Sequence, residues 1–152
     1  MSHGTLATQG CPCGYLGHPR RGCPCTAAQK RHYLARLSGP LVDRFDLFVD
    51  VPAPEPGAML GDPRDEGSAD VRARVVRARE VLGRNVRRTA SAPVRARLAQ
   101  AMADWSLSGR GVARTLAVAH SIAALEGREQ PAAEHVDEAL SFRRGLLELR
   151  VR

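Results

Sequence analysis

All four cysteines of this 152-residue chain lie within fifteen residues, in the stretch CPCGYLGHPRRGCPC. Their spacing is a C-x-C pair, nine intervening residues and a second C-x-C pair. Two such pairs can bring four thiolates to one tetrahedral zinc ion, which orders a segment too small to bury an apolar core. The sequence therefore predicts a structural zinc site formed by Cys11, Cys13, Cys23 and Cys25.

The cysteine pattern leaves other interpretations open, because C-x-x-C is the more common half-site and C-x-C binds at a tighter angle. The thiols could be reduced and free of metal, could form disulfides in an oxidised sample, or could hold an iron–sulfur cluster. His18 could replace one ligand or lie beside the site. A catalytic cysteine is not expected, since the sequence fixes no base beside any of the four.

The cellular compartment of the chain also affects whether its cysteines bind metal or form disulfides. No apolar stretch approaches the roughly 20 residues that a membrane helix requires. The N-terminus MSHGTLATQG has neither the basic start nor the apolar core of a secretory signal. We therefore expect a cytoplasmic protein without a membrane partner. In the cytoplasm, closely spaced cysteines bind metal more often than they form disulfides.

The pattern of apolar residues predicts a mostly α fold. Residues 26–38 predict a helix, since Thr26 and Gln29 match a capping box. Residues 45–51 alternate apolar and polar side chains and predict a short strand. The segment 53–67 is rich in Pro and Gly and predicts a linker. The remaining helices are expected over 68–88, 93–105, 108–126 (ended by Gly127) and from Pro131 onward.

The chain is basic, with a formal net charge of +7 in which Lys30 is the only lysine. Such a charge attracts polyanions, for example nucleic acids. An arginine-biased genome would produce the same composition without any such task, and no basic run in the sequence is interleaved with exposed aromatic residues. Composition alone does not decide between these two interpretations.

Two parts of the sequence resemble one family. The stretch CPCGYLGHPRRGCPCTAAQKRHYLARLSGPLVDRFDLFVDVP resembles the cysteine-rich loop and the following segment of the magnesium-chelatase-like AAA+ ATPases of the ComM or YifB group. LSGRGVARTLAVAHSIAALEG and EHVDEALSFR are similar to the helical lid at the C-terminus of that family. The resemblance covers residues 11 to about 144. It implies the end of an AAA+ α/β core over 1–52, a linker over 53–67 and the lid over 68–152.

The resemblance also implies roles for three arginines. The match to LVDRFD places an arginine finger on Arg44, a residue type that stabilises charge on the γ-phosphate bound by a neighbouring subunit. The match around SGR places the sensor 2 arginine on Arg110, with Arg114 one turn later as a second candidate. From the sequence alone, Arg44 would instead pair with Asp43 or Asp46, and Arg110 would be an ordinary solvent-facing residue.

Several features of the family are missing from the chain. It contains no phosphate-binding loop of the form G-x-x-x-x-G-K-[ST] and no acidic pair after an apolar strand. In the family both precede the cysteine loop, so ATP and magnesium are expected only with a core supplied from elsewhere. Gln9 and Gly10 stand where the family has Asn-Pro, and the lid is shorter between Ala78 and Ser91. We therefore expect a truncated, split or decayed reading frame, or a wrongly assigned start.

The implied function is that of the C-terminal part of a ComM-type ATPase. Members of this family form hexameric rings that drive branch migration of DNA in recombination and transformation. The chain would need an ATPase core or homologous subunits as partners, and we expect it to be inactive as an ATPase alone. Two alternatives stay open: a small zinc-stabilised, Arg-rich module that binds nucleic acid or protein, and a non-functional remnant.

Overall fold

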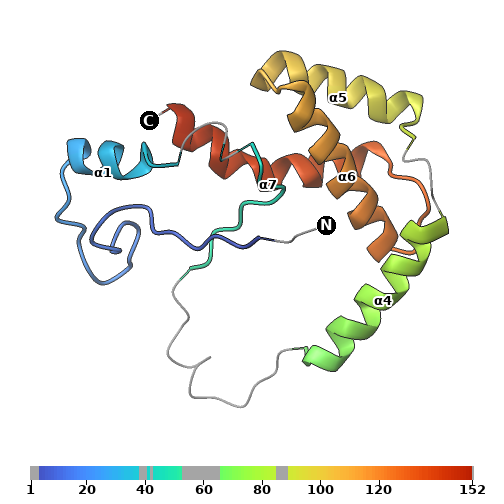
Figure 1. The fold of residues 1–152 in the computed structure, drawn as a ribbon, viewed down its shortest axis with the longest axis horizontal. Coiled ribbons are helices and arrows are strands. Elements are labelled where there is room, and N and C mark those ends of the chain that lie inside the picture. Colours follow the sequence, from blue (N-terminus) through green and yellow to red (C-terminus); the bar gives the residue numbers. More distant parts are fainter. Residues whose placement is uncertain (1–3, 38–40, 42, 53–65, 85–88, 152) are drawn as a thin grey trace.

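The chain is mostly helical. The computed structural model describes residues 4–37, 41, 43–52, 66–84 and 89–151, with the backbone alone over 144–151. These residues form five α-helices and no β-strand: α1 (Ala27–Leu34), α4 (Ser68–Arg84), α5 (Ala92–Trp105), α6 (Gly109–Leu125) and α7 (Ala133–Val151). Figure 1 shows α4, α5 and α6 on the right, α1 and the cysteine-rich loop on the left, and α7 running between the two sides. None of the described helices has both the length and the apolar character needed to cross a bilayer.

The core lies where α5, α6 and α7 meet. α6 packs against both α7 and α4, and α5 packs against α7. Along α6, Ala119 and Ala123 are fully buried and Val112 and Leu116 are partly buried, so the helix presents one apolar stripe to the core. The buried cluster consists of Val94, Leu98 and Ala101 from α5, Ala119 and Ile122 from α6, and Val136, Ala139 and Leu140 from α7.

Both ends of α6 are set by local capping interactions that can be recognised in the sequence. The Ser108 hydroxyl accepts a hydrogen bond from the Gly111 N–H at 3.1 Å and caps the start of the helix. At the other end Gly127 has φ of +79°, a left-handed conformation that costs a residue with a Cβ much more than glycine. The Arg128 N–H then donates to the Ala123 carbonyl at 2.8 Å and closes the last turn. The prediction that Gly127 ends this helix is confirmed.

The prediction of a strand over 45–51 is wrong, because none of these residues is in a strand in the structure. A strand is stabilised by the hydrogen-bond ladder of a neighbouring strand, and the described part of the chain offers none. The segment is instead attached to α7, where the Phe48 N–H donates to the Phe142 carbonyl at 3.0 Å. Three apolar side chains at alternate positions are left exposed: Leu47, Val49 and Val51.

Two predicted elements fall partly outside the described residues. Of the linker expected over 53–67, residues 53–65 lie outside, as do residues 85–88 at the expected end of the first lid helix. α4 begins at Ser68, so this serine is the first helical residue. The Gly67 carbonyl accepts the first hydrogen bonds of the helix, from the N–H groups of Asp70 and Val71.

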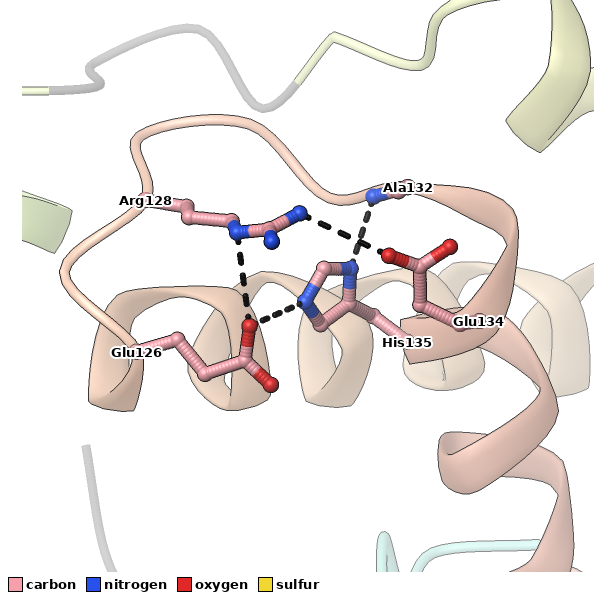
Figure 2. Close-up of polar contacts among 5 residues, drawn as sticks. All are labelled: Glu126, Arg128, Ala132, Glu134 and His135. Atoms are coloured by element: carbon pink, nitrogen blue, oxygen red, sulfur yellow. Dashed lines mark hydrogen bonds and ion pairs between the residues drawn. The ribbon is translucent and has the colours of Figure 1, made fainter.

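A buried histidine holds the connection between α6 and α7 (Figure 2). His135 is only 1% exposed, and its Nδ1 accepts a hydrogen bond from the Ala132 N–H at 2.8 Å. Nε2 therefore carries the proton and donates to the Glu126 carboxylate at 3.0 Å. The Arg128 guanidinium lies 3.4 Å from Glu126 and 3.5 Å from Glu134. The loop between the two helices is thus closed by one connected polar network.

Acid is expected to weaken this connection. The hydrogen bond from His135 lowers the pKa of Glu126, desolvation opposes the shift, and attraction to His135 and Arg128 adds to the lowering. A folded-state pKa below the unfolded value of 4.5 contributes stability above that pH, and this stability is lost as pH falls through the folded-state pKa. In urea unfolding followed by circular dichroism, Glu126→Gln should therefore be less stable than the wild type at neutral pH, and the difference should shrink well below pH 4.5. Glu138→Gln, at an exposed position on α7, is the control, and a difference independent of pH would contradict the assignment.

Candidate metal centre and neighbouring arginines

The four cysteine sulfurs converge on one point. All four Sγ atoms lie within 4.8 Å of one another. The Sγ of Cys11 is 3.4 Å from that of Cys13 and 3.6 Å from that of Cys23, and Cys13 and Cys23 are also 3.6 Å apart. Sulfurs that bind one tetrahedral zinc at about 2.3 Å lie about 3.8 Å from each other, so this arrangement fits the ion. The same separations exceed the disulfide bond length of about 2.0 Å, and all four thiols, including Cys25, are free.

Glycines shape the loop that brings the sulfurs together. Gly14 and Gly17 have φ of +77° and +79°, so both turns of the loop use the left-handed region that favours glycine. The Gly14 N–H donates to the Cys11 carbonyl at 3.2 Å, and the Tyr15 N–H points at the Cys13 sulfur at 3.5 Å. The backbone therefore wraps around the first cysteine pair and leaves its sulfurs facing the second pair.

The close approach of the sulfurs perturbs their acidity. Burial alone would raise the pKa of the 1% exposed Cys11, but hydrogen bonds from Cys13, Cys23 and two backbone N–H groups outweigh it and lower the pKa to about 6. Burial is the largest cause that raises the pKa of Cys23, and burial together with contacts to Cys13 and Cys23 raises the pKa of Cys25 to about 11. Four thiols this close cannot all ionise beside one another without a cation to offset the charge. The donor set is one that zinc prefers.

His18, the alternative ligand, does not join the cluster. Its Nδ1 accepts a hydrogen bond from the Arg20 N–H at 3.1 Å. Its ring stands edge-on to Tyr15, with the ring centroids 5.8 Å apart. Among the described residues, the group whose ligand atoms converge contains only cysteines.

The loop leads directly into α1. Thr26, which follows Cys25, accepts a hydrogen bond from the Gln29 N–H at 3.2 Å, and the Gln29 side chain accepts one from the Thr26 N–H at 2.8 Å. The predicted capping box is therefore confirmed. The Tyr33 hydroxyl of α1 also lies 3.3 Å from the Thr8 hydroxyl, ahead of the first cysteine. The segments before and after the cysteine cluster are thus connected through α1.

Arg44, the predicted arginine finger, lies in an exposed turn. Its N–H donates to the Leu41 carbonyl at 3.0 Å, and its side chain forms no ion pair with another described residue. Pairing with Asp46, which the sequence offered as an alternative, is not formed. Asp46 instead binds the Arg114 guanidinium of α6 at 2.5 Å.

The turn that carries Arg44 is attached to the helical lid at more than one point. Besides the Asp46–Arg114 ion pair and the backbone bond to α7 described above, the buried Arg143 of α7 donates to the Phe45 carbonyl at 3.5 Å. Sequence reasoning missed Arg143. Arg143 lies three residues after Leu140 and therefore on the same apolar face of the helix, which was the signal that its side chain would be buried. A buried cation needs a hydrogen-bond acceptor.

The two candidates for the sensor 2 arginine differ in their surroundings. Arg110 lies in the first turn of α6 and is exposed. Arg114 is half-buried, and its guanidinium is occupied by Asp46. Because Asp46 follows Arg44 by two residues and Arg114 follows Arg110 by one turn, the ion pair brings the two arginine-bearing segments together.

Comparison with known proteins identifies the family. Residues 4–59 match the family described as magnesium chelatase, subunit ChlI. Residues 81–143 match the family described as magnesium chelatase, subunit ChlI C-terminal. Together the two matches include the cysteine cluster, the Arg44 turn and most of the helical lid.

Individual relatives agree with these matches. An uncharacterized protein of Mycobacterium tuberculosis is 40% identical over 156 aligned residues, which cover 91% of this chain and 30% of the relative. YifB of Salmonella typhimurium is 35% identical over 147 residues, and competence protein ComM of Haemophilus influenzae is 34% identical over 145; each alignment covers 85% of this chain and 28% of the relative. The chain belongs to the magnesium-chelatase-like family that includes YifB and ComM. It spans about 30% of the length of these relatives.

Proposed function

We propose that this chain acts as the C-terminal part of a ComM-type AAA+ ATPase, in a cytoplasmic ring that uses ATP to drive branch migration of DNA. The relatives named above support the lineage. The observation that carries the proposal is the exposed Arg44 turn, which is attached to the helix that carries Arg110. In this proposal residues 1–52 complete the ATPase core, 53–67 form the linker and 68–152 form the lid.

Arg44 would act on the ATP of the neighbouring subunit. An arginine finger stabilises the negative charge that develops on the γ-phosphate during transfer, and it does so best when it needs no rearrangement at that moment. The attachments of Phe45, Asp46 and Phe48 to α6 and α7 would supply this rigidity. An exposed guanidinium on such a turn is suited to reach across a subunit boundary.

Arg110 would contact the nucleotide of its own subunit. It lies in the first turn of α6, where the backbone N–H groups favour an anion and where a cation without one is slightly disfavoured. Arg114 would hold the Asp46 carboxylate and so position the turn, instead of touching the nucleotide.

The remaining parts of the nucleotide site would come from elsewhere. These 152 residues contain no phosphate-binding loop, so in this proposal residues outside them would hold the ATP phosphates and magnesium. Zinc would have a structural task, since four cysteine ligands fill a tetrahedral ion and leave no open position for a substrate.

A chimera tests the proposal directly. This chain would replace the aligned 28% of Salmonella YifB, and ATP hydrolysis would be measured with and without branched DNA. We expect an active chimera in which Arg44→Ala lowers the turnover number about 1,000-fold, as expected for loss of an arginine finger. Arg79→Ala, at an exposed position on α4, is the control and should keep full activity. An inactive chimera of an active parent, or an Arg44→Ala variant with unchanged hydrolysis, would contradict the proposal.

A further inference from the structure

The first part of the chain carries positive charge without any acidic residue. Asp43 is the first Asp or Glu in the sequence. Five cations precede it, two in the cysteine-rich loop and three in or just after α1: Arg20, Arg21, Lys30, Arg31 and Arg36. The four arginines are exposed, and the first turn of α1 contains no acidic residue. Even with four thiolates and one Zn²⁺ counted, this part of the molecule has an excess of positive charge and attracts polyanions.

The tip of the cysteine-rich loop combines this charge with an aromatic stack. The Arg21 Cζ lies 4.1 Å from the centroid of the Tyr15 ring, and Arg21 Nη1 donates to the Tyr15 hydroxyl at 2.8 Å. The edge-on contact of His18 with the same ring supports Tyr15 from a second direction. The sequence shows no basic run interleaved with aromatic residues, but the fold of the loop creates such a pairing between residues six positions apart.

The cysteine cluster fixes the position of this stack. Tyr15 lies two residues after Cys13, and its N–H points at the Cys13 sulfur. Arg21 lies two residues before Cys23, in the second half of the loop. Both members of the stack are therefore anchored beside a sulfur that belongs to the metal centre.

We propose that the cysteine-rich loop and α1 form a binding surface for single-stranded DNA, in which an unpaired base stacks on the Arg21–Tyr15 pair and the cations of α1 neutralise phosphates. Stacking requires a base whose face is open, and a duplex hides the faces of its bases. Arginine stacks on aromatic planes as well as carrying charge, so Arg21 can extend the Tyr15 ring towards a base. The surface extends the DNA role proposed above, on which its biological meaning rests.

DNA binding can be measured without nucleotide. The zinc-loaded full chain would be titrated into fluorescein-labelled oligothymidylate at low salt and followed by fluorescence anisotropy. Arg21→Gln and Tyr15→Leu should each weaken binding about 5- to 100-fold, the range for loss of one stacked base. Arg21→Lys, which keeps the charge, should also bind more weakly than the wild type. The control Arg77→Gln removes one exposed cation from α4 and should change the affinity less than about threefold.

Two results would overturn the inference, provided that zinc content and circular dichroism show each variant to be folded. One is an Arg21→Gln variant that binds no worse than Arg77→Gln, because binding would then follow net charge alone. The other is tighter binding of a duplex of the same length than of the single strand. The ATPase chimera uses a different readout, so this surface and the proposed ATPase role can fail independently.

Discussion

The purified chain is expected to contain about one zinc ion, and Cys11→Ser is expected to lower its zinc affinity more than about 100-fold. Removing only the hydrogen-bond partner of a metal ligand already lowers metal affinity about 10- to 100-fold. Cys11 is the most buried of the four cysteines and contacts the sulfurs of both Cys13 and Cys23. A serine hydroxyl at this position is a poor zinc ligand at neutral pH, because it does not ionise there.

Competition with a chromophoric chelator measures this affinity, and substitution by cobalt tests the geometry through the absorption bands of a tetrahedral thiolate complex. His18→Ala is the matched control, since His18 lies in the same loop but outside the cluster, and it should keep the metal. Equal zinc affinity of Cys11→Ser and the wild type would show that the sulfurs meet for some other reason. Loss of zinc from His18→Ala would show that the histidine is a ligand in solution.

Leu140→Ala is expected to lower the free energy of unfolding of the helical lid by about 2–5 kcal/mol. Leu140 is 1% exposed and belongs to the cluster where α5, α6 and α7 meet, so its truncation leaves a cavity among three helices. Unfolding in urea, followed by far-UV circular dichroism, measures the loss. In a small helical domain such a loss is a large part of the total stability.

Leu125→Ala provides the matched comparison, because this leucine ends α6 with 48% of its surface exposed. This substitution should lower the free energy of unfolding by less than about 1 kcal/mol. Zinc content should be unchanged in both variants, since the buried cluster contains no residue of the cysteine-rich loop. Similar losses from the two substitutions would mean that the helices do not share the core described here.

The parts of this fold that the sequence predicted are those set by short-range rules. Gly127 ends α6 because its φ is positive, and Thr26 starts α1 through a bond to a residue three positions away. The convergence of the four cysteine sulfurs was predictable for the same reason, since all four cysteines lie in one loop. Each of these features depends on residues that are neighbours in the chain.

The features that the sequence did not predict depend on contacts between distant residues. The Asp46–Arg114 ion pair joins residues 68 positions apart, and Arg143 reaches a carbonyl 98 positions away. The alternating pattern over 45–51 led to a wrong prediction of a strand, because alternation is only a local preference and no strand lies beside this segment among the described residues. The roles proposed for Arg44 and Arg110 rest on family resemblance, because an exposed arginine has no pattern of its own that distinguishes a phosphate contact from a solvated side chain.

Because α1 is short, its stability depends on the neighbouring cysteine cluster. A helix of eight residues is too short to be stable in water alone, and α1 buries none of its residues. Its N-cap Thr26 directly follows the last cysteine, and the contact of its Tyr33 with Thr8 spans the whole cysteine cluster. Removal of the zinc ion proposed for this cluster should therefore unfold α1 as well as the loop, and three of the cations that precede Asp43 would lose their fixed positions. Metal supply would then act as a switch on the affinity of this chain for polyanions, while the lid helices stay folded.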